Sequence, residues 1–573
     1  MRTVLLLWAS STILLNYPYV VLGCTNLVVT KGASADGGLH FSYSADSGGL
    51  FGELRFLPAA DHAPGSVADV WEWDTGRYLG AIPQVAHTYK VVGHLNEWQV
   101  SIGETTFGGV GILARQKAAK VDYGSLILLA LQRSRSAREA ISVMTDLVAS
   151  HGYASEGETF TIGDPNEVWL MEMIGSGFDT LGAVWVARRV PDGYVTAHAN
   201  QARITTFPRD DPDNCVYAPN VVSVAVSQGL YPADAPVDAF SFSDVYDPLT
   251  FGGARSAEAR VWDFFSRVVP GFGEAHVSYA AGHNLTRRMP LWVVPAEPVS
   301  VSDTFGYMRS HFEGTPFDMS TDLGAGPYGS LYRASPLYWE ATGSLYVNER
   351  PIATQQTGWH FVVQLRHWLP DAIGGLLWFG VDDTGLSVRT PVYGGVTAVA
   401  PSWTRQPTAH TTADAHTFSF ESAFWTFNLV ANMVYSRWRD AAPIVLKRAA
   451  HHEQQYFRET RELEQVWGHA CAAVMGMRWR GQPGGPAGGR VGGARWERGV
   501  GRVSVRAVMG LGVCAGGATP TRSVALADGG QATIDRSGSR RPPADRLLSP
   551  HRPRANYVLA SSVEGTAPAC AGV

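Results

Sequence analysis

The sequence predicts an α+β fold, because hairpin patterns and helix patterns alternate along it. Residues 24–46 contain two strand-like runs around a turn rich in Gly and Asp, and the second run places apolar residues at alternate positions. Residues 159–174 show the same arrangement around the turn-forming triplet Asp164-Pro165-Asn166. The stretch between the two hairpins, from 124 to 147, has the apolar residues of helices.

The elements can be assigned in order along the chain. A helix is predicted at 124–133, which is apolar on most sides, and a second one begins at Ser136, whose spacing to Glu139 is that of a capping box. Four further elements are predicted after the second hairpin: a strand in YVTAHAN, a helix at 257–265, strands and long loops in the aromatic-rich stretch 300–425, and a long polar helix with an apolar stripe at 437–466.

The composition is that of a folded protein with an acidic body. The chain has 573 residues, of which 45% are hydrophobic and 17% charged; it can bury a large core and is too apolar to be disordered throughout. The net charge of −5 hides an excess of nine positive charges from Gly476 onward, so the rest of the chain carries −14. A body this acidic argues against nucleic acid as the partner.

The first 23 residues have the pattern of a secretory signal peptide. Arg2 supplies the positive start, an apolar run follows, and Val21 and Gly23 are the small residues expected before a cleavage at Cys24. The apolar run is too short to span a membrane as a helix, and no later stretch reaches the required length of about 18 apolar residues. We therefore expect a secreted or lumenal protein (extracellular, periplasmic or lysosomal) without a transmembrane segment in the mature chain.

The composition changes again near the C-terminus. Residues 476–573 are rich in Gly, Arg and Pro, contain no Lys and show no sustained periodicity, so this segment is predicted to be disordered. Two explanations of this segment stay open. It is either a basic arm with a function, or sequence that is not a genuine part of the protein. The predicted organisation is a signal peptide at 1–23, one folded domain at 24–470 and a low-complexity tail at 476–573.

A cysteine at the start of a mature chain has a specific chemical use. A free thiol has a pKa near 8.5 and needs a base before it attacks a carbonyl carbon. The α-amine of an N-terminal residue has a pKa of about 8, and in Cys24 it would lie beside the sulfur as a built-in base. Two alternatives stay open: VLGC resembles a bacterial lipoprotein box, in which the cysteine is lipidated, or the cysteine lies near the cleavage point by accident.

An ordered set of sequence blocks covers residues 24–470. The blocks are CTNLVVTKGASADGGLHFSYSADS, NEWQVSIGETTFGG, AHANQARI, GGARSAEARVW, EGTPFDMSTDLGAGP, RPIATQQTGWHFV, WFGVDDT and NLVANMVYSRWRD. Cys-Thr at the start of the predicted mature chain is a weak signal alone, but the ordered set is specific: it resembles the cysteine-nucleophile dipeptidases, the family of bacterial dipeptidase A and the secernins. This family belongs to the N-terminal-nucleophile hydrolases, among which penicillin V acylase and bile salt hydrolase are more distant relatives.

The resemblance implies a four-layer α-β-β-α sandwich of the N-terminal-nucleophile hydrolase type, with Cys24 as nucleophile and its amine as general base. Asp46 matches the acid that the family has beside the nucleophile, where a carboxylate can hold and orient the α-ammonium. Asn200, in AHANQARI, matches an asparagine whose amide N–H donates to the oxyanion in the acylase relatives. For Asp46 and for Asn200 the alternative is a turn residue at the end of a strand.

Glu104 and Arg260 match two further positions near the nucleophile. Glu104, in IGETT, stands where the acylases have a second asparagine. Because a carboxylate repels an oxyanion, the hypothesis for Glu104 is that it binds the free ammonium group of a peptide substrate, while a backbone N–H donates to the oxyanion. Arg260, in SAEARVW, matches an arginine that would lower the thiol pKa or meet a substrate carboxylate, and its alternative is a surface arginine on a helix.

One departure from the family pattern concerns Tyr43. Many relatives have Arg three residues before the acid, where this chain has Tyr43. A tyrosine lacks the fixed positive charge that favours a thiolate. Either Arg260 compensates for the missing charge, or the protein prefers a different substrate.

The function predicted from the sequence is that of a cysteine-type dipeptidase, which hydrolyses dipeptides or short peptides through an acyl-enzyme. No metal or organic cofactor is implied, and the expected partner is the peptide substrate rather than nucleic acid; no oligomeric state is predicted. Two other functions stay open, an N-acyl amide hydrolase like the acylase relatives and a non-catalytic binding protein that is lipid-anchored or secreted.

Overall fold

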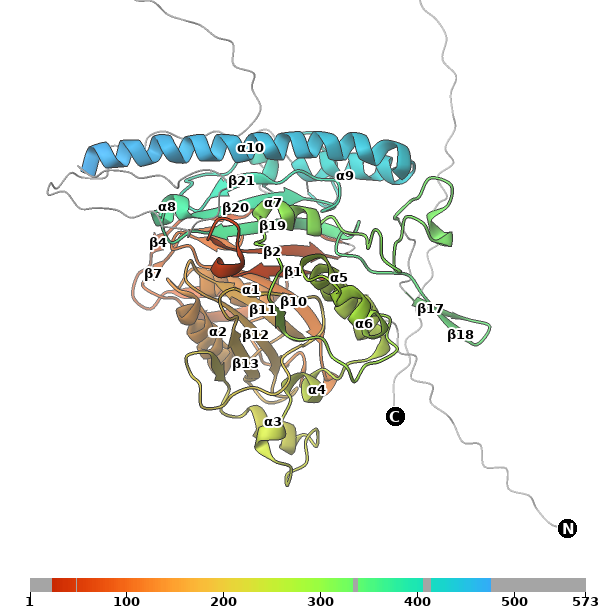
Figure 1. Ribbon diagram of the computed structural model, residues 1–573. Coiled ribbons are helices and arrows are strands. Elements are labelled where there is room, and N and C mark those ends of the chain that lie inside the picture. Colours follow the sequence, from red (N-terminus) through yellow and green to blue (C-terminus); the bar gives the residue numbers. More distant parts are fainter. Residues whose placement is uncertain (1–22, 48, 333–337, 405–413, 476–573) are drawn as a thin grey trace, which may run out of the picture. The chain divides into compact units, whose positions relative to one another are not determined.

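Two large antiparallel sheets form the centre of the computed structural model (Figure 1). The structure describes residues 23–475 except 48, 333–337 and 405–413. The predicted signal peptide, apart from Gly23, and the predicted tail lie outside the described residues, so these two predictions stay predictions.

The first sheet begins with the hairpin predicted at 24–46. Its seven strands, in spatial order, are β16 (Trp292–Val293), β14 (Val195–His198), β1 (Asn26–Val29), β2 (Leu39–Asp46), β19 (Thr357–Leu365), β20 (Gly375–Val381) and β21 (Thr390–Tyr393). All neighbours are antiparallel, and β1 pairs with β2 on one side and with β14 on the other. The strand that follows Cys24 therefore lies inside the sheet, where both of its edges are hydrogen-bonded.

The second sheet contains the second predicted hairpin. Its eight strands, in spatial order, are β15 (Cys215–Tyr217), β13 (Ala183–Arg189), β12 (Val168–Gly175), β11 (Gly157–Gly163), β10 (Ser101–Gly108), β9 (Leu95–Asn96), β8 (Val91–Val92) and β3 (Phe56–Leu57). β11 and β12 pair antiparallel around the predicted turn at 164–166, which confirms that hairpin. Three two-stranded ribbons complete the strands: β4 (Ala60–Asp61) with β7 (His87–Thr88), β5 (Val67–Trp71) with β6 (Tyr78–Pro83), and β17 (Tyr338–Ala341) with β18 (Ser344–Val347).

Helices lie against the outer face of each sheet (Figure 1). Those on the outer face of the second sheet are α1 (Tyr123–Leu131) and α2 (Ala137–His151); α3 (Val221–Ser227) contacts β13, but its buried residues join the cluster between the sheets. Those that contact the first sheet are α5 (Ala259–Val268), α7 (Val301–Tyr307), α8 (Asp371–Gly374), α9 (Ala423–Tyr435) and α10 (Trp438–Met475). The remaining helices are α4 (Phe242–Tyr246) and α6 (Phe272–Ala280), which packs on α5.

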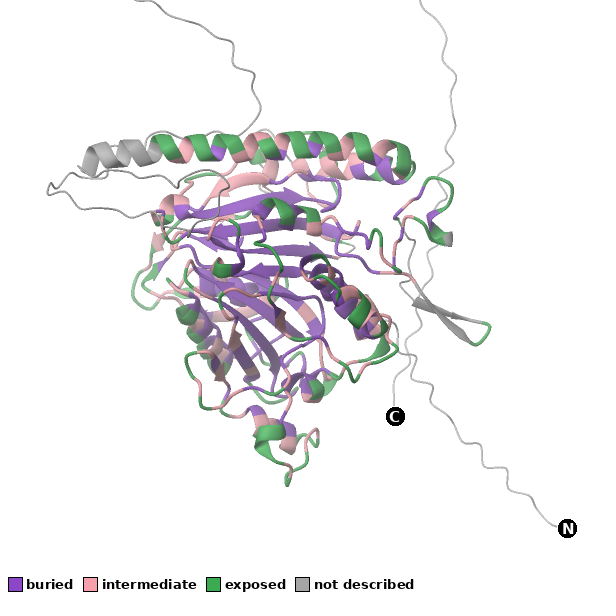
Figure 2. Cartoon of the chain, viewed as in Figure 1, coloured by how far each residue is buried: buried purple, intermediate pink, exposed green. Residues whose placement is uncertain are grey.

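The apolar core follows the alternation of side chains along the strands. In β19, Phe361 and Val363 belong to the cluster between the two sheets, whereas Val362 belongs to the cluster between the first sheet and its helices. A third cluster lies between the second sheet and α1 and α2, and includes Trp169 of β12. Figure 2 shows the result: the long central strands of the two large sheets are almost entirely buried, while the helices expose their outer sides. Successive strand residues point to opposite faces, so strands buried on both faces need apolar residues at most positions.

The predicted helix starts are confirmed with two differences in detail. The Ser136 hydroxyl accepts from the Glu139 N–H at 3.2 Å, as a helix cap does, but the Glu139 carboxylate accepts from the Arg135 N–H at 2.7 Å instead of the Ser136 N–H. The helix predicted at 257–265 is also present, and it begins as a π-helical turn, Gly253–Glu258, before it continues as α5. The observed fold is a mixed α+β structure built on large antiparallel sheets.

Candidate active site

Cys24 lies two residues before the start of β1, with its side chain between the two sheets. Thr25 already bridges to Ser44 of β2, so the chain on the C-terminal side of the cysteine is fixed by the sheet. The Cys24 Sγ lies 3.3 Å from Glu104 Oε1 and 3.6 Å from the Tyr43 hydroxyl. The side chain is buried with 7% of the residue exposed.

The surroundings of the thiol favour its neutral form. Burial raises the pKa of the Cys24 thiol well above its ordinary value, and the nearby carboxyls of Glu104 and Asp46 raise it further. A thiol in this environment does not ionise by itself near neutral pH, because a low-dielectric site and negative neighbours both disfavour a thiolate. The site therefore requires a base that takes the thiol proton.

Asp46 is the last residue of β2, as the alternative of a strand-end residue has it, but its carboxyl is buried and hydrogen-bonded. The Thr357 hydroxyl donates to Asp46 Oδ1 at 2.7 Å, and Arg350 Nη2 lies 3.6 Å from Oδ2. The Asp46 backbone oxygen accepts from the Gly23 N–H at 2.9 Å. Burial raises the pKa of Asp46 to about 6, against the opposing effects of Arg350, Thr357 and Arg260.

Glu104 reaches the thiol from β10 of the second sheet. The Tyr43 hydroxyl donates to Glu104 Oε1, the same oxygen that lies beside Cys24 Sγ. Burial raises the pKa of Glu104, and burial together with the Glu104 charge raises the pKa of the neighbouring Glu158 well above its ordinary value. Two carboxyls this close in a dry site cannot both ionise easily, so the pair tends to keep a proton.

Asn200 lies two residues after the end of β14 and adopts a left-handed backbone conformation with φ of +63°. Its amide Nδ2 donates to the Thr106 backbone oxygen at 2.5 Å, and its Oδ1 accepts from Arg260 Nη2 at 2.8 Å. A non-glycine residue at positive φ is uncommon, and asparagine is among the few that tolerate it. The amide is therefore held in one orientation from both ends.

Arg260 is fully buried in α5, so the alternative of a surface arginine is wrong. It donates from Nη1 to the Cys24 backbone oxygen at 2.7 Å and to the Thr25 hydroxyl at 2.8 Å. It donates from Nη2 to Ala199 and Asn200, and from Nε to the Ser256 oxygen. All five N–H groups of a guanidinium thus have partners in the chain. This arrangement favours a role in positioning Cys24 and Asn200 over direct contact with a substrate carboxylate.

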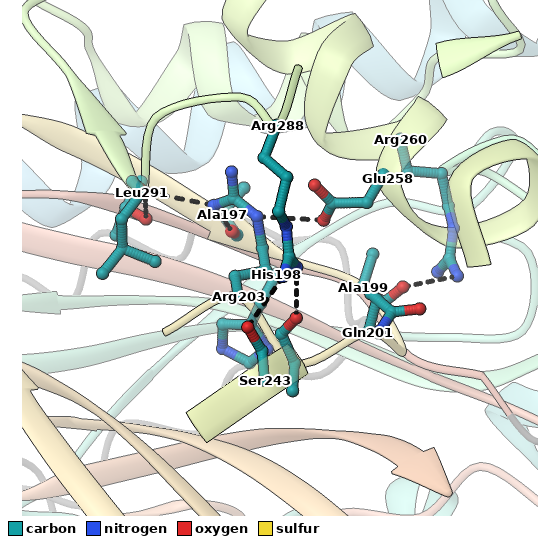
Figure 3. Close-up of polar contacts among 12 residues, drawn as sticks. Ala197, His198, Ala199, Gln201, Arg203, Ser243, Glu258, Arg260, Arg288 and Leu291 are labelled. Atoms are coloured by element: carbon teal, nitrogen blue, oxygen red, sulfur yellow. Dashed lines mark hydrogen bonds and ion pairs between the residues drawn. The ribbon is translucent and has the colours of Figure 1, made fainter. Parts of the chain in front are cut away.

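A second buried arginine behind this site was assigned no role from the sequence. Arg203 Nε lies 2.9 Å from Glu258 Oε1, and both side chains are 2% exposed. Arg203 also donates to the backbone oxygens of Ala197 and Leu291, so that it connects β14 with the helix start that carries Arg260 (Figure 3). Figure 3 shows Arg203 and Glu258 facing each other beside Arg288.

Arg350 is a further residue of the site that sequence reasoning missed. Its Nη2 donates to the Gly23 backbone oxygen at 2.5 Å, and its side chain is 1% exposed. A Cβ atom on Gly23 would lie 1.8 Å from Arg350 Nη1, so a larger residue at position 23 would require the Arg350 guanidinium to move. The one available signal was its place at the head of the RPIATQQTGWHFV block.

The structure thus brings all five predicted site residues into one network: Cys24, Asp46, Glu104, Asn200 and Arg260. In the described part of the chain, no three His, Cys, Asp or Glu side chains gather in a way that would hold a metal ion. None of the helices described has the length and apolar character of a membrane span.

The Cys24 thiol lies beside the Glu104 carboxyl and the Tyr43 hydroxyl, and Arg260 binds the Cys24 backbone oxygen; a cysteine-dependent hydrolase can use such an arrangement. The comparisons with known proteins agree with this class. The model of peptidase family C69 matches residues 53–450, and the chain belongs to this family. The matched range begins after Cys24 and Asp46, and it includes Glu104, Asn200 and Arg260.

Named relatives of the chain are bacterial dipeptidases. The chain is 25% identical over 412 residues to a probable dipeptidase of Salmonella dublin, which covers 68% of this chain and 86% of that protein. It is 23% identical over 434 residues to a probable dipeptidase of Latilactobacillus sakei, with coverage of 72% and 81%. It is 23% identical over 485 residues to probable dipeptidase A of Streptococcus pyogenes serotype M3, with coverage of 79% and 90%.

Proposed function

We propose that this family C69 peptidase is a cysteine-type dipeptidase in which Cys24 is the nucleophile and its own α-amine the general base. The observation that carries the proposal is the position of the Cys24 thiol, fixed at the start of an interior strand and within contact of Glu104. Cleavage after Gly23 creates the amine next to a thiol that does not ionise unaided.

The reaction has two halves. The α-amine of Cys24 takes the thiol proton as sulfur attacks the scissile carbonyl carbon, and the resulting ammonium gives that proton to the leaving amine as the C–N bond breaks. Water then attacks the thioester, and the thiol is restored as the carboxylic acid leaves. Asn200 stabilises the oxyanion through its amide, Arg260 positions Cys24 and Asn200, and Asp46 orients the ammonium.

Glu104 is the group proposed to select substrates with a free N-terminus. Glu104, Glu158 and Asp74 all have raised pKa values caused first by burial, and no Lys, Arg or His is among the main influences on any of them. A substrate ammonium would supply the missing positive charge to this cluster. The test is Glu104→Gln: unchanged cleavage of free-amine dipeptides by that variant contradicts this role.

The fold supports the same proposal. Sheets packed face to face with helices on both outer sides are the arrangement that a four-layer α-β-β-α sandwich of the N-terminal-nucleophile hydrolases would have. We further propose that residues 1–23 are a signal peptide and that the mature protein is secreted or lumenal, from the leader-like sequence before Cys24.

The proposal is tested by N-terminal sequencing and intact mass of the mature protein, followed by assays of free-amine dipeptides and matching N-acyl amino acids. We expect a chain that begins with an unmodified Cys24, cleaves dipeptides and loses at least 1,000-fold in kcat/KM on Cys24→Ala. Faster cleavage of N-acyl amino acids would instead indicate an amide hydrolase, and a lipidated Cys24 with no cleavage of either substrate would indicate a binding protein.

A further inference from the structure

The uncut chain shows which charged group will lie nearest to the amine that cleavage creates. Arg350 Nη2 donates to the Gly23 oxygen at 2.5 Å, and that oxygen lies about 2.3 Å from the Cys24 nitrogen in a standard peptide group. The Arg350 guanidinium is therefore within about 4.8 Å of the atom that becomes the α-amine.

Cleavage changes the contacts of Arg350 more than those of Arg260. The partners of Arg260 are Cys24, Thr25, Ser256, Ala199 and Asn200, all of which remain in the mature protein. Arg350 loses its Gly23 partner with the leader, while its ion pair to Asp46 keeps the guanidinium in place. The side chain then faces the new terminus from the loop before β19.

We propose that Arg350 is a positioning residue that keeps the α-amine of mature Cys24 in its neutral, basic form near neutral pH. A fixed positive charge at this distance disfavours a second positive charge, so the ammonium form becomes less stable and the amine loses its proton more readily. Arg350 thereby supplies a cation that Tyr43 does not, and its proposed effect is on the base. This inference rests on the proposed N-terminal nucleophile.

The other charged groups around the α-amine shift its pKa in opposite directions. Asp46, on β2, favours the ammonium, and Glu104, on β10, adds negative charge from the second sheet. Arg260, on α5, acts in the same direction as Arg350 but is joined to the carbonyl side of Cys24. Tyr43, also on β2, is a neutral donor beside the sulfur. Arg350 is thus the cation bound on the nitrogen side of Cys24, and Arg260 is the one bound on its carbonyl side.

The experiment compares the mature wild type with Arg350→Gln, which removes the charge, and Arg350→Lys, which keeps it. Arg77→Gln, on the exposed β5–β6 ribbon, is the matched control. N-terminal sequencing verifies that each chain begins at Cys24, and thermal unfolding verifies the fold. The α-amine is then titrated directly by carbon-13 NMR after reductive methylation, and kcat/KM for a dipeptide is measured against pH.

We expect Arg350→Gln to raise the pKa of the α-amine by about one unit or more, and to move the acid limb of kcat/KM to higher pH by the same amount. Activity on that limb then falls about tenfold and recovers at high pH, while Arg350→Lys and Arg77→Gln stay near the wild type. Asp46→Asn provides a second variant, which should move the amine pKa downward.

Several results would overturn the inference. One is an unchanged amine pKa in Arg350→Gln, and another is an equal loss of activity at every pH. A third is an increase in KM at constant kcat that occurs with free-acid dipeptides but not with their C-terminal amides. That result would mean that Arg350 binds the substrate carboxylate. A mature chain that starts elsewhere than Cys24 also overturns it. If the amine pKa shifts as expected but no dipeptide is cleaved, the inference stands and the proposed dipeptidase activity fails.

Discussion

The Tyr43 hydroxyl donates a hydrogen bond to the Glu104 carboxylate, and the Cys24 sulfur lies beside both groups. Tyr43 comes from the first sheet and Glu104 from the second, so this hydrogen bond also joins the sheets at the nucleophile. At the position where many relatives carry an arginine, this chain therefore has a neutral donor paired with an acid.

Removal of the Tyr43 hydroxyl should destabilise the protein. In Tyr43→Phe the buried Glu104 Oε1 keeps only the weak donor Cys24 Sγ, and the loss of a buried hydrogen bond to a carboxyl costs about 1–3 kcal/mol. Chemical denaturation at pH 7 measures the change in the free energy of unfolding. Tyr78→Phe is the control, because Tyr78 donates to Asp69 on the exposed surface. An equal decrease in the free energy of unfolding in the two variants would mean that the buried hydrogen bond contributes no more to stability than the exposed one.

Asp382→Asn should stabilise the protein above neutral pH. Burial raises the pKa of Asp382 from 3.8 to about 7, with a further increase from the adjacent Asp383. A raised folded-state pKa means that the carboxyl favours the folded state only at low pH, and that this contribution is lost as the pH rises through about 7. Asparagine keeps an acceptor for the Asn428 amide, which donates at 2.8 Å, and tolerates the φ of +64°.

The expected size of this effect depends on pH. We expect Asp382→Asn to raise the free energy of unfolding by about 1–3 kcal/mol at pH 8 and to leave it nearly unchanged at pH 4. Denaturant titrations at the two pH values check this, with Asp69→Asn on the exposed β5 strand as control. The same difference at both pH values would show that ionisation of Asp382 is not responsible.

Asn200→Gly should separate the chemistry of the amide from the conformation of the backbone. Glycine accepts a φ of +63° without strain, so the turn after β14 can remain while the amide is lost. If the amide stabilises the oxyanion, kcat should fall about 100- to 1,000-fold with KM little changed. Steady-state kinetics on a dipeptide measure both constants. A KM increase at constant kcat would instead place Asn200 in ground-state binding.

The Arg203–Glu258 pair should be sensitive to removal of one charge. Glu258→Gln leaves the guanidinium of Arg203 without its charged partner in a buried site, and such a change costs about 3–5 kcal/mol. The control is Glu156→Gln, whose partner Arg115 is exposed and whose loss should cost less than about 1 kcal/mol. Thermal unfolding of both variants compares the pairs directly; similar shifts would contradict the expected cost of burial.

The hairpins and the helix start at Ser136 could be predicted from the sequence because their signals are local. Alternation within a strand and capping at a helix start need only a few neighbouring residues. The family resemblance predicted that one site contains Cys24, Asp46, Glu104, Asn200 and Arg260. The contacts among these residues could be described only from the structure.

Arg350 shows why the remaining part of the site could not be predicted. It meets Gly23 across 327 sequence positions, because β19, which follows Arg350, pairs with β2, which ends beside the nucleophile. A single arginine before a proline in a loop has no periodicity and no spacing that would indicate such a contact. The burial of Arg260 was hidden for a related reason, since a helix pattern alone does not identify the sheet residues on which an arginine will lie.

The buried position of Gly23 has a consequence for the order of events in biosynthesis. With its N–H bonded to Asp46 and its oxygen to Arg350, Gly23 is buried, so an external protease does not reach the bond before Cys24 in the folded structure. The proposed cleavage by such a protease would therefore have to precede the placement of β1 between β2 and β14. In a chain that folded first, the Cys24 nitrogen would stay an amide, which cannot act as the proposed base.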